Sequence, residues 1–253
     1  MRIGLGLGLA KPSVVTAFSP LNVEDIIFGY ESIGAIQGTN NEYCNNAFNA
    51  PRIQYIVSLI KDLSENGWDI PQTTDALKPF LEDDVNSLPS YKFGGSYYGI
   101  HASKPTGIAA FKMYWVMNNL DTHGGGVGGI VSGINGFGRT LILDSNKYRA
   151  NHDGVAWDST GTHATNAIEI WSYEYSGSGG TQKFYRNNVL DRSGAIGTIS
   201  SGTDTLAMGT ISSFTSFKLR GNISAVFAYS TIPGALDDQN IWNYLSDTYG
   251  VPI

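Results

Sequence analysis

Alternation of apolar and polar positions dominates the chain from about residue 91 onward. The clearest alternating runs are separated by clusters of Gly, Ser, Asn and Asp, and they cover residues 108–117, 168–175, 181–186 and 223–229. This period of two predicts β-strands joined by turns. Lys112 and Tyr114 fall opposite the apolar side of their run, which predicts a half-buried strand. Asn187-Asn188 follows another run, and both asparagines tolerate the positive φ that a tight hairpin requires.

A single helix is predicted, close to the C-terminus. Asp237 is a favourable N-cap residue, and Leu236 before it is placed to pack against Ile241 one turn later. Gly250 is suited to end the helix in a left-handed conformation. Residues 19–50 show poor periodicity and predict a short helix or irregular packing. Many strands and one terminal helix together predict an all-β sandwich with the helix packed on its edge.

The N-terminal residues 1–18 carry a separate pattern. Apolar side chains alternate with glycines at Ile3, Leu5, Leu7 and Leu9. This alternation predicts an extended strand whose glycine side allows another backbone to approach closely. The apolar run meets Lys11 without a small-residue cleavage site, so we do not expect a signal peptide. The glycines give only part of a dinucleotide-binding pattern. We therefore expect an anchor arm, held by this chain or by a neighbouring subunit.

Composition and charge exclude several classes of function. The 253 residues include 16 Lys and Arg against 22 Asp and Glu, a net charge of −6. This balance argues against a nucleic-acid partner, because a phosphate backbone is bound by positive surface. No run approaches the roughly 18 apolar residues of a membrane span, so no membrane insertion is expected. The single cysteine, Cys44, excludes a disulfide within the chain and suits folding in a reducing compartment.

Several stretches between residues 51 and 253 follow one another in a familiar order. They are 61–69 (KDLSENGWD), 88–98 (LPSYKFGGSYY), 184–190 (FYRNNVL), 219–226 (LRGNISAV) and the terminal helix through residue 251. In order and spacing they resemble the concanavalin A-like lectin/glucanase superfamily, in its laminin-G-like branch common in phage and bacterial surface proteins. The resemblance implies a two-sheet jelly roll over 51–253, preceded by the lead-in 19–50 and the arm 1–18.

The chain departs from this family at positions that bear on function. Glu65 replaces a glycine, Asn188 replaces the hairpin glycine, and the turn after Gly95 lacks an aspartate that is frequent in the family. The hydrolases of the superfamily carry paired acids on one strand face. Here Glu169 and Glu174 are five residues apart, so a regular strand points them to opposite faces. We expect them to be solvated edge charges, and no enzymatic activity is predicted.

One cluster of residues suits a carbohydrate. An aromatic ring can stack on a sugar while amide and carboxylate groups bind its hydroxyls. The residue types required are found in Trp157, Asn151, Asp153, Tyr97 and Tyr98. Exposed aromatics serve equally well as anchors in a protein interface, and the composition satisfies both interpretations.

The same region offers a calcium site as an alternative. Carboxylate oxygens in loops are typical calcium ligands, and Asp153 and Asp158 lie in one such stretch. Ordinary turn chemistry explains Asp153-Gly154 equally well. No other cofactor is expected.

Taken together, these features predict a non-enzymatic structural protein of a bacteriophage virion, as a head or tail decoration or a fibre component. The lectin-like jelly roll would face outward, and the arm 1–18 would bind other virion proteins or further copies of the chain. Such a protein is assembled in the host cytoplasm and exposed on the particle. The alternative is a carbohydrate-binding module that recognises host surface glycans, and a glycoside hydrolase is a third, weaker interpretation.

Overall fold

The computed structural model describes most of the chain in separate ranges. They are residues 18–32, 44–47, 55–57, 59–95, 98–100, 103, 105–119, 127–132, 139–144, 147–152, 155–195, 205–210 and 218–253. Ile3, Leu5, Leu7 and Leu9 of the predicted arm lie outside these ranges. Within them the chain is mostly β-strand. No helix in the described ranges is long and apolar enough to cross a membrane.

The larger sheet has ten strands among the described residues, and their pairings are antiparallel. In spatial order they are β16 (Val189–Ala195), β15 (Thr181–Arg186), β14 (Ile168–Tyr175), β9 (Phe111–Asn119), β18 (Arg220–Tyr229), β7 (Leu88–Gly94), β6 (Phe80–Val85), β3 (Tyr55–Val57) and β2 (Cys44–Ala47). The tenth strand, β1 (Ile26–Glu31), pairs with β18. The runs expected at 168–175 and 181–186 are confirmed as β14 and β15.

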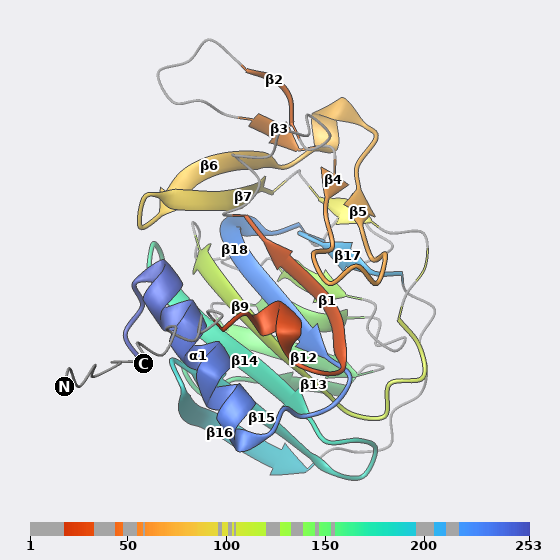
Figure 1. The fold of residues 1–253 in the computed structure, drawn as a ribbon, viewed down its shortest axis with the longest axis vertical. Helices are drawn as coiled ribbons and strands as arrows, with labels where there is room; N and C mark the ends of the chain where they lie inside the picture. Colours follow the sequence, from red (N-terminus) through yellow and green to blue (C-terminus); the bar gives the residue numbers. More distant parts are fainter. Residues whose placement is uncertain are drawn as a thin grey trace, which may run out of the picture.

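The smaller sheet packs against the larger one and has six strands in the described ranges. In spatial order they are β13 (Val155–Asp158), β12 (Lys147–His152), β11 (Arg139–Asp144), β10 (Val127–Ser132), β17 (Ala207–Met208) and β8 (Gly99–Ile100). The remaining elements are the pair β4 (Leu59–Ile60) and β5 (Ile70–Pro71), the 3-10 helices η1 (Pro20–Asn22) and η3 (Asp75–Leu77), and α1 (Ala235–Tyr249). Figure 1 shows α1 lying across the outer face of the larger sheet. The predicted all-β sandwich with one short C-terminal helix is therefore confirmed, but the helix covers the face of the larger sheet and not the predicted edge.

Two apolar layers hold the sheets and the helix together. Between the sheets, the Tyr148 ring of β12 lies 4.5 Å from the Trp171 ring of β14 and 5.2 Å from the Trp115 ring of β9, measured between centroids. Between the larger sheet and α1, Tyr114 meets Trp242 edge to face at 5.7 Å. Burial of such large rings is a main source of the stability of the fold.

Strand β9 is buried on both faces, which corrects the half-buried strand that its alternation predicts. Tyr114 is fully buried and Lys112 is 2% exposed, because α1 covers the face that was expected to meet solvent. The Lys112 ammonium lies 2.6 Å from Asp238 Oδ1 and 3.7 Å from Glu174 Oε2. A buried cation is tolerated here because two carboxylates compensate its charge.

The helix α1 begins earlier than the sequence predicts. Its N-cap is Gly234 rather than Asp237, and Leu236 is 74% exposed, so Leu236 does not pack against Ile241. Asp238 in the first turn accepts a hydrogen bond from the Tyr114 hydroxyl as well as from Lys112, and these tertiary contacts hold the start of the helix. The predicted end is confirmed: Gly250 has φ 66° and its N–H donates to the Ser246 carbonyl at 2.8 Å.

The lead-in 19–50 is not simply irregular or helical, because part of it is β1. This strand pairs with β18, and its four central residues are buried. The helix η1 covers the outer face so closely that a Cβ on Gly29 would lie 2.6 Å from the Leu21 side chain. Burial on both faces removes the alternation that identifies a strand in sequence. This part of the lead-in therefore belongs to the sandwich.

The predicted hairpin at Asn187-Asn188 is confirmed. The two residues join β15 to β16 and have φ 47° and 63°. Asn188 thus adopts the conformation for which the family more often uses glycine.

Candidate functional site

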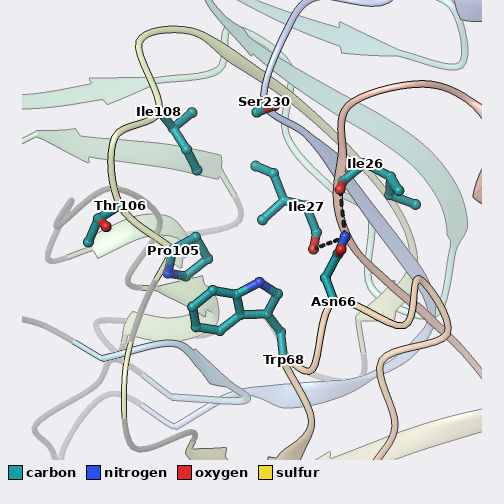
Figure 2. Close-up of a pocket in the computed structure, with 8 residues that line it drawn as sticks. All are labelled: Ile26, Ile27, Asn66, Trp68, Pro105, Thr106, Ile108 and Ser230. Carbon is teal, nitrogen blue, oxygen red and sulfur yellow. Dashed lines mark hydrogen bonds between the residues drawn. The ribbon is translucent and has the colours of Figure 1, made fainter.

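An open hollow of about 400 Å³ lies beside β1. Its apolar wall consists of Ile26 and Ile27 of β1 with Pro105 and Ile108 of the segment before β9. Its other lining groups are the Trp68 indole and the polar side chains of Asn66, Thr106 and Ser230. In Figure 2 the indole lies beside Pro105, and Asn66 and Ile27 lie across the hollow from Thr106. The hollow thus combines one aromatic surface with amide and hydroxyl groups.

Asp62 organises the loop that carries Trp68. Its carboxylate is buried, and Oδ1 accepts from the Gly29 N–H at 3.0 Å, from the Ser64 N–H at 3.0 Å and from the Ser64 hydroxyl at 2.7 Å. Its Oδ2 accepts from the Trp68 N–H at 3.1 Å, while the Asp62 N–H donates to Asp69 Oδ1 at 2.8 Å. A buried carboxylate is stable when its oxygens are satisfied in this way. The loop is therefore braced both internally and against β1.

Trp68 is held through its backbone on both sides. Besides the bond from its N–H to Asp62, its carbonyl accepts from the Tyr30 hydroxyl at 2.5 Å. Burial raises the pKa of Tyr30 well above its ordinary value, and the charges of Asp62 and Asp69 raise it further, so this hydroxyl stays a donor. The half-buried indole also packs against the core between the sheets. A ring held this rigidly loses little conformational entropy when it binds a ligand.

Asn66 fastens the tip of the same loop to β1. Its amide group donates to the carbonyls of Ile26 and Ile27 at 2.8 and 3.2 Å. Glu65 has φ 65° and Gly67 has φ 80°, so the tip turns through two left-handed residues. The family has a glycine at the position of Glu65, which agrees with this conformation. A non-glycine residue there adds about 1 kcal/mol of strain.

Two of the predicted carbohydrate residues, Trp157 and Tyr98, do not come together in one site. Trp157 of β13 stacks on Phe184 with centroids 5.2 Å apart and planes at 10°, and the Arg192 guanidinium lies 4.8 Å from its ring centroid. Tyr98 precedes β8, which is at the opposite edge of the smaller sheet from β13. Five strand spacings of about 4.8 Å separate these edges. Trp157 and Tyr98 therefore cannot contact one small sugar.

The other predicted carbohydrate residues are less fully described. The backbone of Asn151 belongs to β12, but its side chain lies outside the described part of the structure, as do Tyr97 and Asp153. The ammonium group of Lys218 lies 5.4 Å from the Tyr98 ring centroid. A binding role for these residues stays a prediction.

Asp158, a predicted calcium ligand, is engaged by an arginine. Its Oδ2 accepts from Arg149 Nη2 at 3.0 Å, and hydrogen bonding to Arg149 is the main reason that its pKa is lowered. The other predicted ligand, Asp153, lies outside the described residues. Where the structure is described, no three His, Cys, Asp or Glu side chains gather closely enough to hold a metal ion. Calcium binding stays a prediction.

Glu169 and Glu174 face opposite sides of β14, as their spacing predicts, but the expectation of solvated edge charges is wrong. They are 3% and 5% exposed. Glu169 Oε2 contacts His163 Nδ1 and accepts from Trp171 Nε1 at 2.8 Å, and Oε1 accepts from Arg186 Nη2. Partners from the adjacent loop and from β15 thus satisfy a carboxylate that the sequence alone places at an exposed edge.

Trp68 is the functional candidate that the sequence analysis missed. The stretch 61–69 resembles a segment of a known family, but its sequence did not lead us to predict a binding role. The available signal is an aromatic residue directly after an Asn-Gly turn, which is where loops present side chains. Its partners across the hollow come from residues far away in the sequence, so no local pattern identifies them.

Comparison with known proteins supports the fold. No protein-family model matches the chain, and no curated protein matches its sequence. The structure is similar to the binding domain of botulinum neurotoxin serotype D, with a TM-score of 0.54 and 13% identity over 87% of this chain and 52% of that one. It is also similar to the binding domain of Paraclostridial Mosquitocidal Protein 1, with a TM-score of 0.55 and 9% identity over 89% of this chain and 53% of that one.

A further similar structure is Trypanosoma rangeli sialidase in complex with sialic acid, with a TM-score of 0.51 and 10% identity over 88% of this chain and 33% of that one. The chain therefore spans about half the length of the two binding domains and a third of the sialidase. At these identities the likeness concerns the lectin-like β-sandwich fold. Because the fold occurs both in binding domains and in part of an enzyme, it does not assign an activity.

Proposed function

We propose that this chain is a non-enzymatic, lectin-like module that binds a glycan in the hollow beside Trp68. The observation that carries the proposal is one open hollow that combines the half-buried Trp68 indole, whose backbone is held on both sides, with Asn66, Thr106 and Ser230. A sugar presents an apolar face that stacks on an aromatic ring and hydroxyls that bind amide and hydroxyl groups. The fold shared with two domains named for binding supports the same interpretation.

Replacing Trp68 with alanine is expected to weaken glycan binding at least about tenfold, because the stacking surface of the hollow is removed. Trp157→Ala, which removes the aromatic residue predicted from sequence, is expected to leave the affinity unchanged. Binding is measured first on a glycan array, in calcium and again in EDTA, and then by calorimetry with the strongest ligand. Thermal unfolding of each variant shows that it is folded.

A second substitution tests the hollow without removing core contacts. Thr106 is exposed at the rim, and Thr106→Trp fills the hollow while leaving the sandwich intact. We expect it to abolish binding with little change in unfolding temperature. Binding that survives in Trp68→Ala and Thr106→Trp but is lost in Trp157→Ala would overturn the proposal in favour of the β13 region. Loss of binding in EDTA would favour the calcium site predicted at Asp153 and Asp158.

We further propose that the module is carried on a bacteriophage particle. The particle is assembled in the host cytoplasm, and the module is exposed on its surface, where it contacts other virion proteins or further copies of itself. Among the described strands, β16 is the last of the larger sheet, and Val189 and Leu190 on it are 68% and 51% exposed. An open edge of this kind accepts an added strand. The alternating residues of the arm 1–18, in a neighbouring copy, have the pattern of such a strand.

Deleting residues 1–17 is expected to leave a folded domain that no longer assembles. The deletion retains Phe18, whose ring meets Tyr244 edge to face at 6.5 Å, so the packing around α1 is preserved. Circular dichroism checks the fold, and co-purification with particles measures incorporation. Leu190→Lys on the β16 edge is expected to reduce incorporation as well, because a charge there opposes strand addition. Normal incorporation of the deletion variant would sink the anchoring proposal.

A further inference from the structure

The segments on one side of the hollow are strongly acidic. Residues 24–27 and 61–69, which supply one side of it, contain five carboxylates and a single lysine, Lys61. The carboxylates belong to Glu24, Asp25, Asp62, Glu65 and Asp69. Carboxylates so close to a site set a negative potential over it, which attracts cations and repels anions.

Contacts with the lining residues place these charges beside the hollow. The Asp25 carbonyl accepts from the Ser230 N–H at 2.8 Å and from its hydroxyl at 3.2 Å, so the Asp25 backbone is next to one end of the hollow. Its carboxylate accepts from the neighbouring Thr231 hydroxyl at 3.1 Å. Asp62 binds the Trp68 N–H from beneath, and Glu65 is exposed next to Asn66 at the loop tip. The acidic residues therefore flank the hollow on the segment before β1 and on the Trp68 loop.

Asn66 and Ser230 already use donors on backbone carbonyls and are left with acceptor atoms, whereas the Thr106 hydroxyl and the Trp68 indole N–H are donors. The Asn66 amide nitrogen is already used on the carbonyls of Ile26 and Ile27. Its Oδ1 is the atom left for a ligand, and that atom only accepts hydrogen bonds. A ligand group that donates hydrogen bonds fits Asn66 and Ser230, whereas a ligand carboxylate placed against these two residues would face acceptors and negative charge.

We propose that the hollow selects sugars without an acidic group and prefers a hexosamine with a protonated amine to its N-acetylated form. This inference rests on the proposed function and adds the class of ligand. Sugar hydroxyls and an ammonium group donate to Asn66 Oδ1 and lie in the favourable field of Asp25 and Glu65. Sialylated or sulfated sugars are excluded by the same field.

The test is a glycan array of matched pairs, which differ only by a terminal sialic acid or by N-acetylation of a glucosamine oligomer. It is run at about 20 mM and about 300 mM NaCl, where screening lengths differ severalfold. We expect binding of the non-acidic member of each sialic acid pair to be at least about fivefold stronger at low salt, with a smaller difference at high salt. The free glucosamine oligomer is expected to bind several times more tightly than its N-acetylated partner.

Variants that lack one or both negative charges test whether Asp25 and Glu65 cause the preference for sugars without an acidic group. The double variant Asp25→Asn, Glu65→Gln keeps the size and polarity of both side chains. It is expected to reduce the difference in binding between the two glycans of each matched pair. The control is Asp247→Asn, which removes an exposed charge on α1. Equal or stronger binding of acidic sugars, or a preference unaffected by salt and by the double variant, would overturn this inference while leaving the glycan-binding function in place. Absence of binding to every sugar would overturn both.

Discussion

Glu169→Ala is expected to lower the free energy of unfolding by about 4 kcal/mol, because several groups around a buried carboxylate lose their hydrogen-bond partner at once. The alanine variant leaves His163, the Trp171 indole N–H and the Arg186 guanidinium without their shared acceptor. Urea unfolding at pH 7 measures the loss. The control Glu24→Ala removes an exposed glutamate and is expected to change the free energy by less than about 0.5 kcal/mol.

The same carboxylate makes stability depend on acidic pH. Burial by itself raises the pKa of Glu169, but bonds from His163 and Trp171 and the charge of Arg186 hold it below the ordinary value. The native protein then binds fewer protons than the unfolded chain in this range, so the stabilisation is present above the ordinary glutamate pKa and falls as the pH drops through the lowered one. Between pH of about 5 and about 3, the native chain should lose stability more steeply than Glu169→Gln. Parallel pH profiles would contradict this role.

Asp62→Ala is expected to lower the free energy of unfolding by about 3 kcal/mol, because buried N–H groups lose their acceptor. The carboxylate binds Gly29, Ser64 and Trp68, so its removal frees the loop from β1 and releases the indole. We therefore expect loss of glycan binding as well as of stability. Urea unfolding and calorimetry measure the two effects separately.

Two control variants are compared with Asp62→Ala, and both are expected to lower the free energy of unfolding by less. Ser64→Ala removes only the hydroxyl donor and should lower the free energy by about 1 kcal/mol. Asp247→Ala removes an exposed carboxylate on α1 and should change the free energy by less than about 0.5 kcal/mol. A folded Asp62→Ala protein that still bound glycan with full affinity would show that the braced position of Trp68 is not required for binding.

Some elements of the fold are determined by local sequence and others by tertiary contacts. The hairpin at Asn187-Asn188 and the helix end at Gly250 were predictable, because a positive φ restricts which residues fit. Strand β1 was not, because η1 and the core bury both of its faces and remove the alternation. The half-burial expected for β9 failed for the same reason, since α1 covers its second face.

The sequence by itself determined the β-sandwich class, the positions of β9, β14, β15 and β18 and the terminal helix, because period-two patterning and turn residues act locally. The lectin-like character was implied by the resemblance to a known family. Only the tertiary structure decided which side chains meet. Glu169 received its partners through a loop and the register of β14 with β15, and the hollow formed where β1, the Trp68 loop, the segment before β9 and Ser230 converge. Those segments are brought together by strand pairing across as many as two hundred residues, and a pattern read along the chain carries no information on such distant contacts.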